Sequence, residues 1–267
     1  MEQYPIIAFL TDFGLKNPYV ASMKAVVYSI CPKSKIVDIS HSLTKWNIIE
    51  ASYVLECSFH YFPKNTIFTV VIDPGVGTSR RPLIIRTKNY FFVGPDNGVL
   101  IRPATLDKIL EIHEIKNKKY MLQNISYTFH GRDIFAPVSA YIACGTKLEE
   151  IGPLINDPVD TPVKSPLEKD TYVEGIVYFI DDFGNIATNI SASYIFEKGY
   201  TFGGKFLVEI KGKQYLIPFV KSFGHVQKGK LLLQENSCKK LEIAVNQGSA
   251  SNILNINPGD KIKIYFS

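Results

Sequence analysis

Long apolar runs, paired cysteines and blocks of one charge are all missing from this 267-residue sequence. No stretch approaches the ~20 apolar residues of a membrane-spanning helix, and the start, Met1-Glu2-Gln3, lacks the basic and apolar regions of a secretory signal. The four cysteines, Cys31, Cys57, Cys144 and Cys238, are scattered, which indicates neither a zinc site nor a disulfide framework. We therefore expect a cytoplasmic protein with reduced thiols and no membrane partner.

The charge of the chain is mild and evenly spread. The formal net charge is +5, charged residues make up 21%, and the lysines at 116, 118 and 119 are typical of a solvated loop. The sequence therefore indicates no nucleic-acid partner. With 46% hydrophobic residues the chain can bury sizeable cores, and its length allows one large domain or two.

The most informative stretch is the end of an apolar, β-branched run, Ile67–Ile72, which has the composition of a buried strand. It stops at Asp73-Pro74-Gly75, and the glycines at 75 and 77 would let the backbone pass close to a ligand. Arg80 and Arg81 follow. In open α/β sheets ligands bind at the carboxyl ends of strands, although a tight turn with solvated arginines would give the same pattern.

Two earlier segments have a similar design. Ile6–Leu10 and Ile36–Ile39 are short apolar strands that end in polar residues. Asn17-Pro18 predicts a helix start, with Asn as the cap and Pro at the first helical position. Asn47 and Glu50 resemble a capping box for a second helix, which we expect to reach about residue 57. Together these segments predict a β-α-β-α-β arrangement with a site along one sheet edge.

The second half of the chain changes character after a proline-containing polar stretch, 152–167, which is typical of a linker. Before it, Leu83–Thr87 and Tyr90–Val93 alternate like a hairpin, and Ile134–Cys144 predicts a helix. After it we expect short strands at Val173–Ile180, Phe206–Ile210, Gln214–Phe219, Leu231–Gln234, Leu241–Val245 and Lys261–Phe266. The predicted fold is an α/β sandwich-like domain with a largely parallel sheet, residues 1–160, followed by a small β-barrel domain, residues 168–267.

Several titratable side chains lie next to the predicted strand ends or glycine turns. They are Asp12, Asp73, Arg80 or Arg81, His130, Arg132 and Asp133. Asp12 could accept from a ribose diol or cap the following helix, and Arg132-Asp133 could be only a local salt bridge. His130 could be a satisfied buried histidine, but its neighbours favour a site. Trp46, the only tryptophan, could fill a core or form the wall of a pocket.

The ordered set of motifs resembles the S-adenosyl-L-methionine (SAM) hydroxide adenosyltransferase family, which is related to fluorinase and chlorinase. The motifs are Thr11-Asp12-Phe13-Gly14, 72–78 (Ile-Asp-Pro-Gly-Val-Gly-Thr), Asp96-Asn97-Gly98, 128–135 (Thr-Phe-His-Gly-Arg-Asp-Ile-Phe), Phe183-Gly184-Asn185 and Asn236-Ser237. Each motif is weak alone, but their order is specific. The resemblance covers about residues 6–264.

This resemblance implies a homotrimer of two-domain chains, each site lying between one first domain and a neighbour's second domain. It implies hydrolysis of SAM to adenosine and L-methionine, with no cofactor and no metal. Asp73, Arg80 and His130 would hold and activate water; the choice of Arg80 over Arg81 rests on spacing. The substrate-binding residues would be Asp12 for the ribose, Trp46 and Phe129 for the pocket, Asp181 and Ser237 for the methionine end, and Asn185 for adenine.

The sequence departs from the family pattern at the expected methionine end. Cys238 stands where a halogenase-like member has an arginine for the methionine carboxylate, and Lys239-Lys240 replaces a Gly-aromatic pair.

The implied reaction needs no general acid, because the sulfonium group of SAM leaves as a neutral thioether. We expect His130, placed by Asp73 and Arg80, to order the water and help draw off its proton.

Other functions remain open at this stage. A SAM-dependent halogenase is one, although fluorinase has Tyr-Ser where this chain has His130-Gly131. A second is a metal hydrolase that uses Asp12, Asp73, Asp96, Asp133 and His130 as ligands. A third is a protein that binds adenosine without catalysis.

Overall fold

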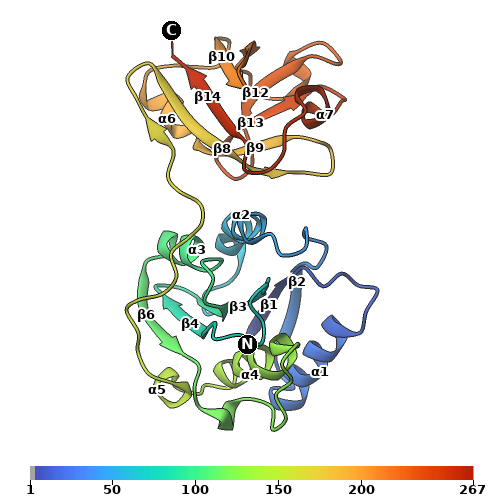
Figure 1. Ribbon diagram of the computed structural model, residues 1–267, viewed down its shortest axis with the longest axis vertical. Coiled ribbons are helices and arrows are strands. Elements are labelled where there is room, and N and C mark those ends of the chain that lie inside the picture. The colour runs from blue at the N-terminus through green and yellow to red at the C-terminus, as the bar shows by residue number, and fades with distance from the viewer. Residues whose placement is uncertain (1–3, 267) are drawn as a thin grey trace. The chain divides into compact units, whose positions relative to one another are not determined.

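The computed structural model describes residues 4–266, and the chain divides into two compact units, residues 1–162 and 163–267 (Figure 1). Each unit has its own sheet and its own hydrophobic core. Within the described range, no helix is both long and apolar enough to cross a membrane.

The first unit is built on a six-stranded sheet. Its strands are β1 (Ile6–Thr11), β2 (Lys35–Ser40), β3 (Ile67–Val71), β4 (Pro82–Thr87), β5 (Phe91–Pro95) and β6 (Ile109–Glu114). Their order is β2-β1-β3-β5-β4-β6. The neighbours from β2 to β5 pair in parallel, whereas β4 is antiparallel to both β5 and β6. The predicted α/β fold with a largely parallel sheet is confirmed, as is the hairpin between β4 and β5.

Helices cover both faces of this sheet. They are α1 (Tyr19–Ile30), α2 (Ile48–Ser58), α3 (Ile101–Leu106), α4 (Ala136–Ala143) and α5 (Leu148–Ile151), with 3₁₀ turns at Phe59–Tyr61 and Lys118–Tyr120 and a π-helical turn at Gly131–Phe135. Ile7 and Phe9 of β1 pack with α1 and α4 residues, whereas Ala8 and Leu10 pack with α2 residues. Because successive strand side chains point to opposite faces, one apolar strand serves two cores.

Of the two predicted helix caps, one is confirmed and the other is wrong. Asn47 is the N-cap of α2, and its side-chain oxygen accepts a hydrogen bond from the Glu50 N–H at 3.1 Å. The predicted cap at Asn17 is wrong. Pro18 occupies the N-cap position of α1, and no side chain donates or accepts a capping hydrogen bond there.

The second unit is an antiparallel sheet that nearly closes into a barrel, which confirms the predicted barrel-like domain. Its strands are β7 (Leu167–Glu168), β8 (Tyr172–Ile180), β9 (Ile186–Ser191), β10 (Lys205–Ile210), β11 (Lys213–Pro218), β12 (Leu231–Glu235), β13 (Lys240–Val245) and β14 (Lys261–Tyr265), with helices α6 (Ser193–Glu197) and α7 (Ala250–Leu254) and a 3₁₀ turn at Phe223–His225. The path runs β11-β10-β14-β8-β9-β13-β12, with β7 paired to β8. A bridge between Phe219 and Leu233 brings its two ends together.

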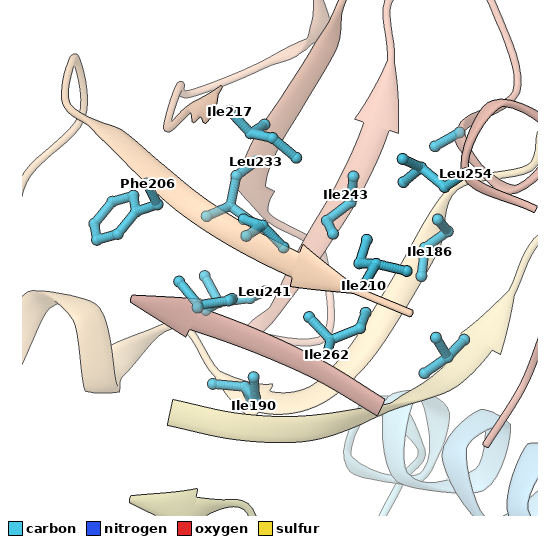
Figure 2. Close-up of a cluster of buried hydrophobic side chains, with 14 of the residues drawn as sticks. Ile186, Ile190, Phe206, Ile210, Ile217, Leu233, Leu241, Ile243, Leu254 and Ile262 are labelled. Atoms are coloured by element: carbon cyan, nitrogen blue, oxygen red, sulfur yellow. The ribbon is translucent and has the colours of Figure 1, made fainter. Parts of the chain in front are cut away.

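The core of this unit lies inside the curved sheet. Figure 2 shows Leu233 of β12 and Leu241 and Ile243 of β13 among the buried side chains of this cluster. The alternation of side chains therefore directs Gln234 and Glu242, which lie opposite each other in the β12–β13 register, to the other face.

Two expectations need correction. β9 was not predicted, although all but its last residue are buried. The thiols of Cys31 and Cys144 are free, but Cys57 and Cys238 are not, so the expectation of reduced thiols holds for only two of the four cysteines.

Candidate active site

The carboxyl ends of β1 and β3 bring two carboxylates to one edge of the first sheet. Asp12 directly follows β1, and Asp73 lies two residues beyond β3, which pairs with β1 in parallel. A cavity of about 220 Å³ opens between them, and its wall includes His130, Phe129 and Trp46. Five of the residues expected at a site are therefore neighbours in space, although they come from four separate segments of the chain.

Asp73 and Arg80 form a buried ion pair. Nε of Arg80 donates to Oδ1 of Asp73 at 3.1 Å, and Nη2 of Arg80 pairs with Oδ2. Only 7% of the arginine side chain and 5% of the aspartate side chain are exposed. Arg81 points elsewhere, because its guanidinium pairs with Asp96 at 2.7 Å and with Asp157 at 2.9 Å. Arg80, and not Arg81, therefore contacts Asp73, which lines the cavity.

His130 completes this cluster by contacting Arg80. Its Nδ1 lies 3.0 Å from Nη2 of Arg80. A guanidinium can only donate, so Nδ1 must accept, and the neutral ring carries its proton on Nε2. Burial, and then the charge of Arg80, lower the pKa of His130, and the charges of Asp73 and Asp133 oppose this only in part. The imidazole is therefore neutral at physiological pH.

One donor of this cluster has no acceptor. Nη1 of Arg80 is buried and donates to no atom of the described residues. Nε and Nη2 are already held by Asp73 and His130, so the guanidinium cannot turn freely to satisfy Nη1. Leaving a buried donor unpaired is costly, so this Nη1 is a natural partner for a polar ligand atom, and both residues that hold the arginine line the cavity.

Asp12 is held by the loop that carries Trp46. Oδ2 of Asp12 accepts from the Trp46 N–H at 2.7 Å, and Lys45 Nζ donates to the Asp12 carbonyl at 2.9 Å. Trp46 has a φ of 62° and its residue is 67% exposed. Asp12 itself is buried, and within residues 4–266 its Oδ1 has no hydrogen-bond partner. One carboxylate oxygen is therefore positioned and the other is available.

Aromatic rings form the apolar side of the cavity. Phe129 lies edge-on to Phe13 and Tyr19, with ring centroids 5.7 and 5.1 Å apart. A Cβ on Gly131 would lie 3.2 Å from Sδ of Met23 and 3.3 Å from both phenylalanine rings. The wall beside His130 is therefore closely packed, and no larger side chain fits at position 131 without displacing it.

Arg132 and Asp133 have a structural role. Asp133 is fully buried, accepts from Arg132 Nε at 2.6 Å, and accepts from both the N–H and the hydroxyl of Ser126 at 2.8 Å. These bonds hold the loop that precedes His130, and they lower the pKa of Asp133 against the effect of burial. The alternative of a local salt bridge is thus the observed arrangement.

The carboxylates of the metal-site alternative have separate partners. Asp96 pairs with Arg81, Asp133 with Arg132 and Asp73 with Arg80. Over residues 4–266 no group of three or more His, Cys, Asp or Glu side chains is arranged to hold a metal ion. The set proposed as ligands is therefore not gathered around one point.

The second unit contains its own, larger cavity of about 730 Å³. Asp181, Asn185 and Ser237 all line it. Oδ1 of Asp181 accepts from the N–H groups of Phe183 and Asn185, and Oδ2 accepts from the Asn185 side-chain amide at 2.9 Å. Asp181 therefore shapes the turn before β9 and fixes the orientation of Asn185.

Two residues that the sequence did not indicate as site residues matter here: one supports the loop around Asp12, and the other lines the larger cavity. His41, after β2, places its Nδ1 2.8 Å from the Thr11 hydroxyl, and its carbonyl accepts from the Gly14 N–H at 2.6 Å, which fixes the loop around Asp12. Glu242 of β13 lines the larger cavity although it is buried. The feature of the sequence that could have indicated Glu242 is a carboxylate between apolar residues of a predicted strand.

The structure defines a two-domain protein with a cavity in each unit, and the family follows from comparison with known proteins. The chain matches the SAM hydroxide adenosyltransferase N-terminal domain over residues 7–152 and the corresponding C-terminal domain over residues 175–263. It belongs to this family.

Known proteins and a solved structure are similar to this chain over nearly its whole length. The (R)-S-adenosyl-L-methionine hydrolase of Thermus thermophilus is 35% identical over 265 residues, 97% of this chain and 98% of that one. A fluorinase of an Actinoplanes species is 29% identical over 96% of this chain and 95% of its own length. A crystal structure of an uncharacterized conserved protein from Thermotoga maritima is 41% identical, with a TM-score of 0.92 over 97% of this chain and 99% of that one.

Proposed function

We propose that this enzyme hydrolyses SAM to adenosine and L-methionine, with catalysis in the first unit. The observation that carries the proposal is the Asp73–Arg80–His130 cluster: Asp73 and His130 line one cavity with Asp12, and Arg80, which they hold, has an unpaired buried donor. The family membership and the hydrolase relatives support it. Because those relatives are named (R)-SAM hydrolases, we further propose that the (R) sulfonium epimer is the preferred substrate.

The chemistry requires an oxygen nucleophile behind the ribose 5′ carbon. A bond forms between the oxygen of water and C5′, the C5′–S bond breaks, and its electron pair goes to sulfur. The water proton passes to solvent, and methionine leaves as a neutral thioether. Asp12 is suited to hold the ribose diol through its available oxygen, and fixed geometry of this kind contributes up to roughly 7–11 kcal/mol in the best model systems.

Arg80 is the residue we assign to hold the nucleophile. Asp73 and His130 anchor Nε and Nη2, so the Nη1 donor is left for the oxygen of water or hydroxide. A fixed cation beside water favours its ionised form, which is the better nucleophile. His130 was expected to draw off the water proton. Its Nε2-protonated tautomer favours a different role, in which the ring accepts from Arg80 and positions it.

The tight packing of Gly131 favours hydrolysis over halogenation. The hydroxyl that fluorinase has at this place would meet Met23 and two aromatic rings here. We therefore retain the halogenase only as an outcome to be tested, by incubation with SAM and chloride or fluoride and a search for 5′-halo-adenosine.

We also propose the homotrimer that the family resemblance implies, with residues of the second unit completing each site. The cavity of about 220 Å³ in the first unit is smaller than the ~300–1,000 Å³ typical of ligand pockets, and Trp46 at its rim is largely exposed. In this arrangement Ser237 and Asp181 contribute to the methionine end and Asn185 to adenine. Light scattering of the purified protein would measure the mass, and a monomer at working concentration would contradict the proposal.

The test of the reaction is purified protein with SAM in oxygen-18 water, followed by chromatography and mass spectrometry. The proposal expects adenosine carrying the heavy isotope at its 5′ oxygen, together with unlabelled methionine. Asp73→Ala should lose turnover while SAM binding is kept. Intact SAM after prolonged incubation with both epimers would overturn the proposal, and would leave an adenosine-binding protein as the better description.

A further inference from the structure

The cavity of the second unit contains a buried carboxylate that no part of the proposed reaction uses. Glu242 lies in the middle of β13, and its residue is only 9% exposed. Its neighbours Leu241 and Ile243 point into the barrel core (Figure 2), so its own side chain points to the opposite face, where the cavity lies. A charged residue at such a place is rarely incidental, because burial of a carboxylate is costly unless the charge is compensated.

Neutral groups hold this carboxylate in a defined position. Nε2 of Gln234, directly opposite on β12, donates to Oε1 of Glu242 at 2.7 Å. Nδ2 of Asn236 lies 3.4 Å from Oε2. Both partners also line the cavity, and both are amides without charge. The carboxylate is thus oriented but not neutralised.

Lys221 also lines this cavity, but its Nζ lies 5.9 Å from the centroid of the Phe202 ring and is not paired with Glu242. No Lys, Arg or His side chain of residues 4–266 is paired with Glu242 in the structure, and the nearby charge of Asp181 is of the same sign. Burial, and to a smaller degree Asp181, raise the pKa of Glu242. Both oxygens of Asp181 already accept from its own turn, whereas Oε2 of Glu242 has only the 3.4 Å contact with Asn236 among the described residues. A positively charged ligand group would satisfy the site.

We propose that Glu242 binds the α-ammonium group of the amino-acid end of SAM and thereby selects substrates that carry it; this inference rests on the proposed function. SAM carries two cationic centres. The sulfonium must stay at the reacting carbon, beside Arg80 and Asp73, and it has no N–H to donate. The adenine amino group is neutral. Only the ammonium combines a charge with donors, and charge-assisted hydrogen bonds of this kind are among the strongest in proteins.

The departure at position 238 fits this assignment. The family resemblance implies an arginine for the methionine carboxylate at this place in a halogenase-like member, whereas this chain has Cys238. A second charged contact would add affinity for the amino acid at a site without that cation. Glu242 would supply such a contact to the ammonium group, at the opposite end of the amino-acid zwitterion from the carboxylate.

The test compares Glu242→Gln with the native enzyme, using SAM, the deaminated analogue of SAM that lacks only the α-amino group, and adenosine. For SAM the variant should raise KM roughly 10- to 100-fold with little change in kcat, since one charged hydrogen bond is lost. Adenosine should bind to both proteins equally. The analogue should bind the native enzyme about as weakly as SAM binds the variant, and the variant should no longer distinguish the two ligands.

Controls keep the outcomes distinct. Glu174→Gln removes a carboxylate of the same unit outside the cavity, where Glu174 pairs with Lys261 at 2.9 Å, and should leave KM unchanged. Glu242→Asp, which keeps the charge, should fall between native enzyme and Glu242→Gln. An unchanged KM for SAM, or equal weakening for SAM and adenosine, would overturn the inference. If native protein binds SAM but releases no adenosine, the proposed function fails, while the binding comparison still decides the role of Glu242.

Discussion

Nη2 of Arg80 lies 3.0 Å from Nδ1 of His130, and this one contact determines the protonation state of the ring. Because the guanidinium has no lone pair to offer, the imidazole must accept through Nδ1 and remain neutral. The same contact, with the ion pair to Asp73, fixes Arg80 next to two residues that line the cavity. The histidine therefore positions a cation, and its effect on the reaction passes through Arg80.

The first prediction concerns pH. Burial and the Arg80 charge lower the pKa of His130 below its ordinary value of 6.5. Above that lowered pKa the ring is neutral and the cluster is intact; below it two cations face each other and Arg80 is displaced. We expect kcat/KM to stay level through neutral pH and to fall only at pH values below 6.5. A fall beginning above pH 7 would contradict the neutral-ring assignment.

The second prediction separates the two neighbouring arginines. Arg80→Lys removes the Nη donors and should lower kcat about 10²–10³-fold, as loss of one positioned donor does in other enzymes. Arg81→Lys is the matched control, because Arg81 pairs with Asp96 and Asp157 away from the cavity, and kcat should change less than about threefold. Steady-state kinetics measure both. Equal losses in the two variants would show that Arg80 has no special role.

The third prediction concerns Gly131. A serine there would bring its Cβ to 3.2 Å from Sδ of Met23 and 3.3 Å from two aromatic rings. We expect Gly131→Ser to reduce hydrolysis at least about tenfold and to make no 5′-halo-adenosine from chloride or fluoride, since the wall must shift before a hydroxyl can be presented. Chromatography of both reactions measures this. Appearance of a halogenated nucleoside would mean that one residue separates the two chemistries.

A fourth prediction is that catalysis does not depend on a divalent metal ion. Three of the four carboxylates in the metal-site alternative, Asp73, Asp96 and Asp133, are each engaged with their own arginine. Dialysis against a chelator, followed by assay in the presence of the chelator, should leave turnover unchanged. Loss of activity that returns with a specific ion would refute this and revive the metal-hydrolase alternative.

A fifth prediction concerns stability. Asn47 caps α2 through the Glu50 N–H, so Asn47→Ala should lower the free energy of unfolding by about 0.5–2 kcal/mol. Asn17→Ala is the control, because α1 has no side-chain cap hydrogen bond and Pro18 occupies its N-cap position. Denaturant unfolding of both variants, compared at constant m-value, measures the difference. A similar cost at both positions would mean that neither asparagine acts as a cap.

Some polar interactions could not have been inferred from one sequence. β9 escaped prediction because Thr188 and Asn189 interrupt its apolar pattern. In the fold the Thr188 hydroxyl donates to the Leu241 carbonyl, and the Asn189 amide donates to the Lys164 carbonyl. Both carbonyl partners are distant in the sequence. Without these hydrogen bonds, burial of the hydroxyl and the amide would be unfavourable.

The sequence by itself determined the local elements and their polar ends, because apolar alternation and strand-terminating residues such as Pro74 act over a few positions. It placed Asp12 and Asp73 at strand ends and indicated the barrel-like second domain. Only the tertiary structure decided that Arg80 and not Arg81 contacts Asp73, that His130 accepts from a guanidinium, and that Glu242 faces a cavity without a cation paired to it. These facts depend on contacts between segments that are distant in the sequence. Where two neighbouring residues are of the same type, as at positions 80 and 81, the sequence does not indicate which of them makes the contact.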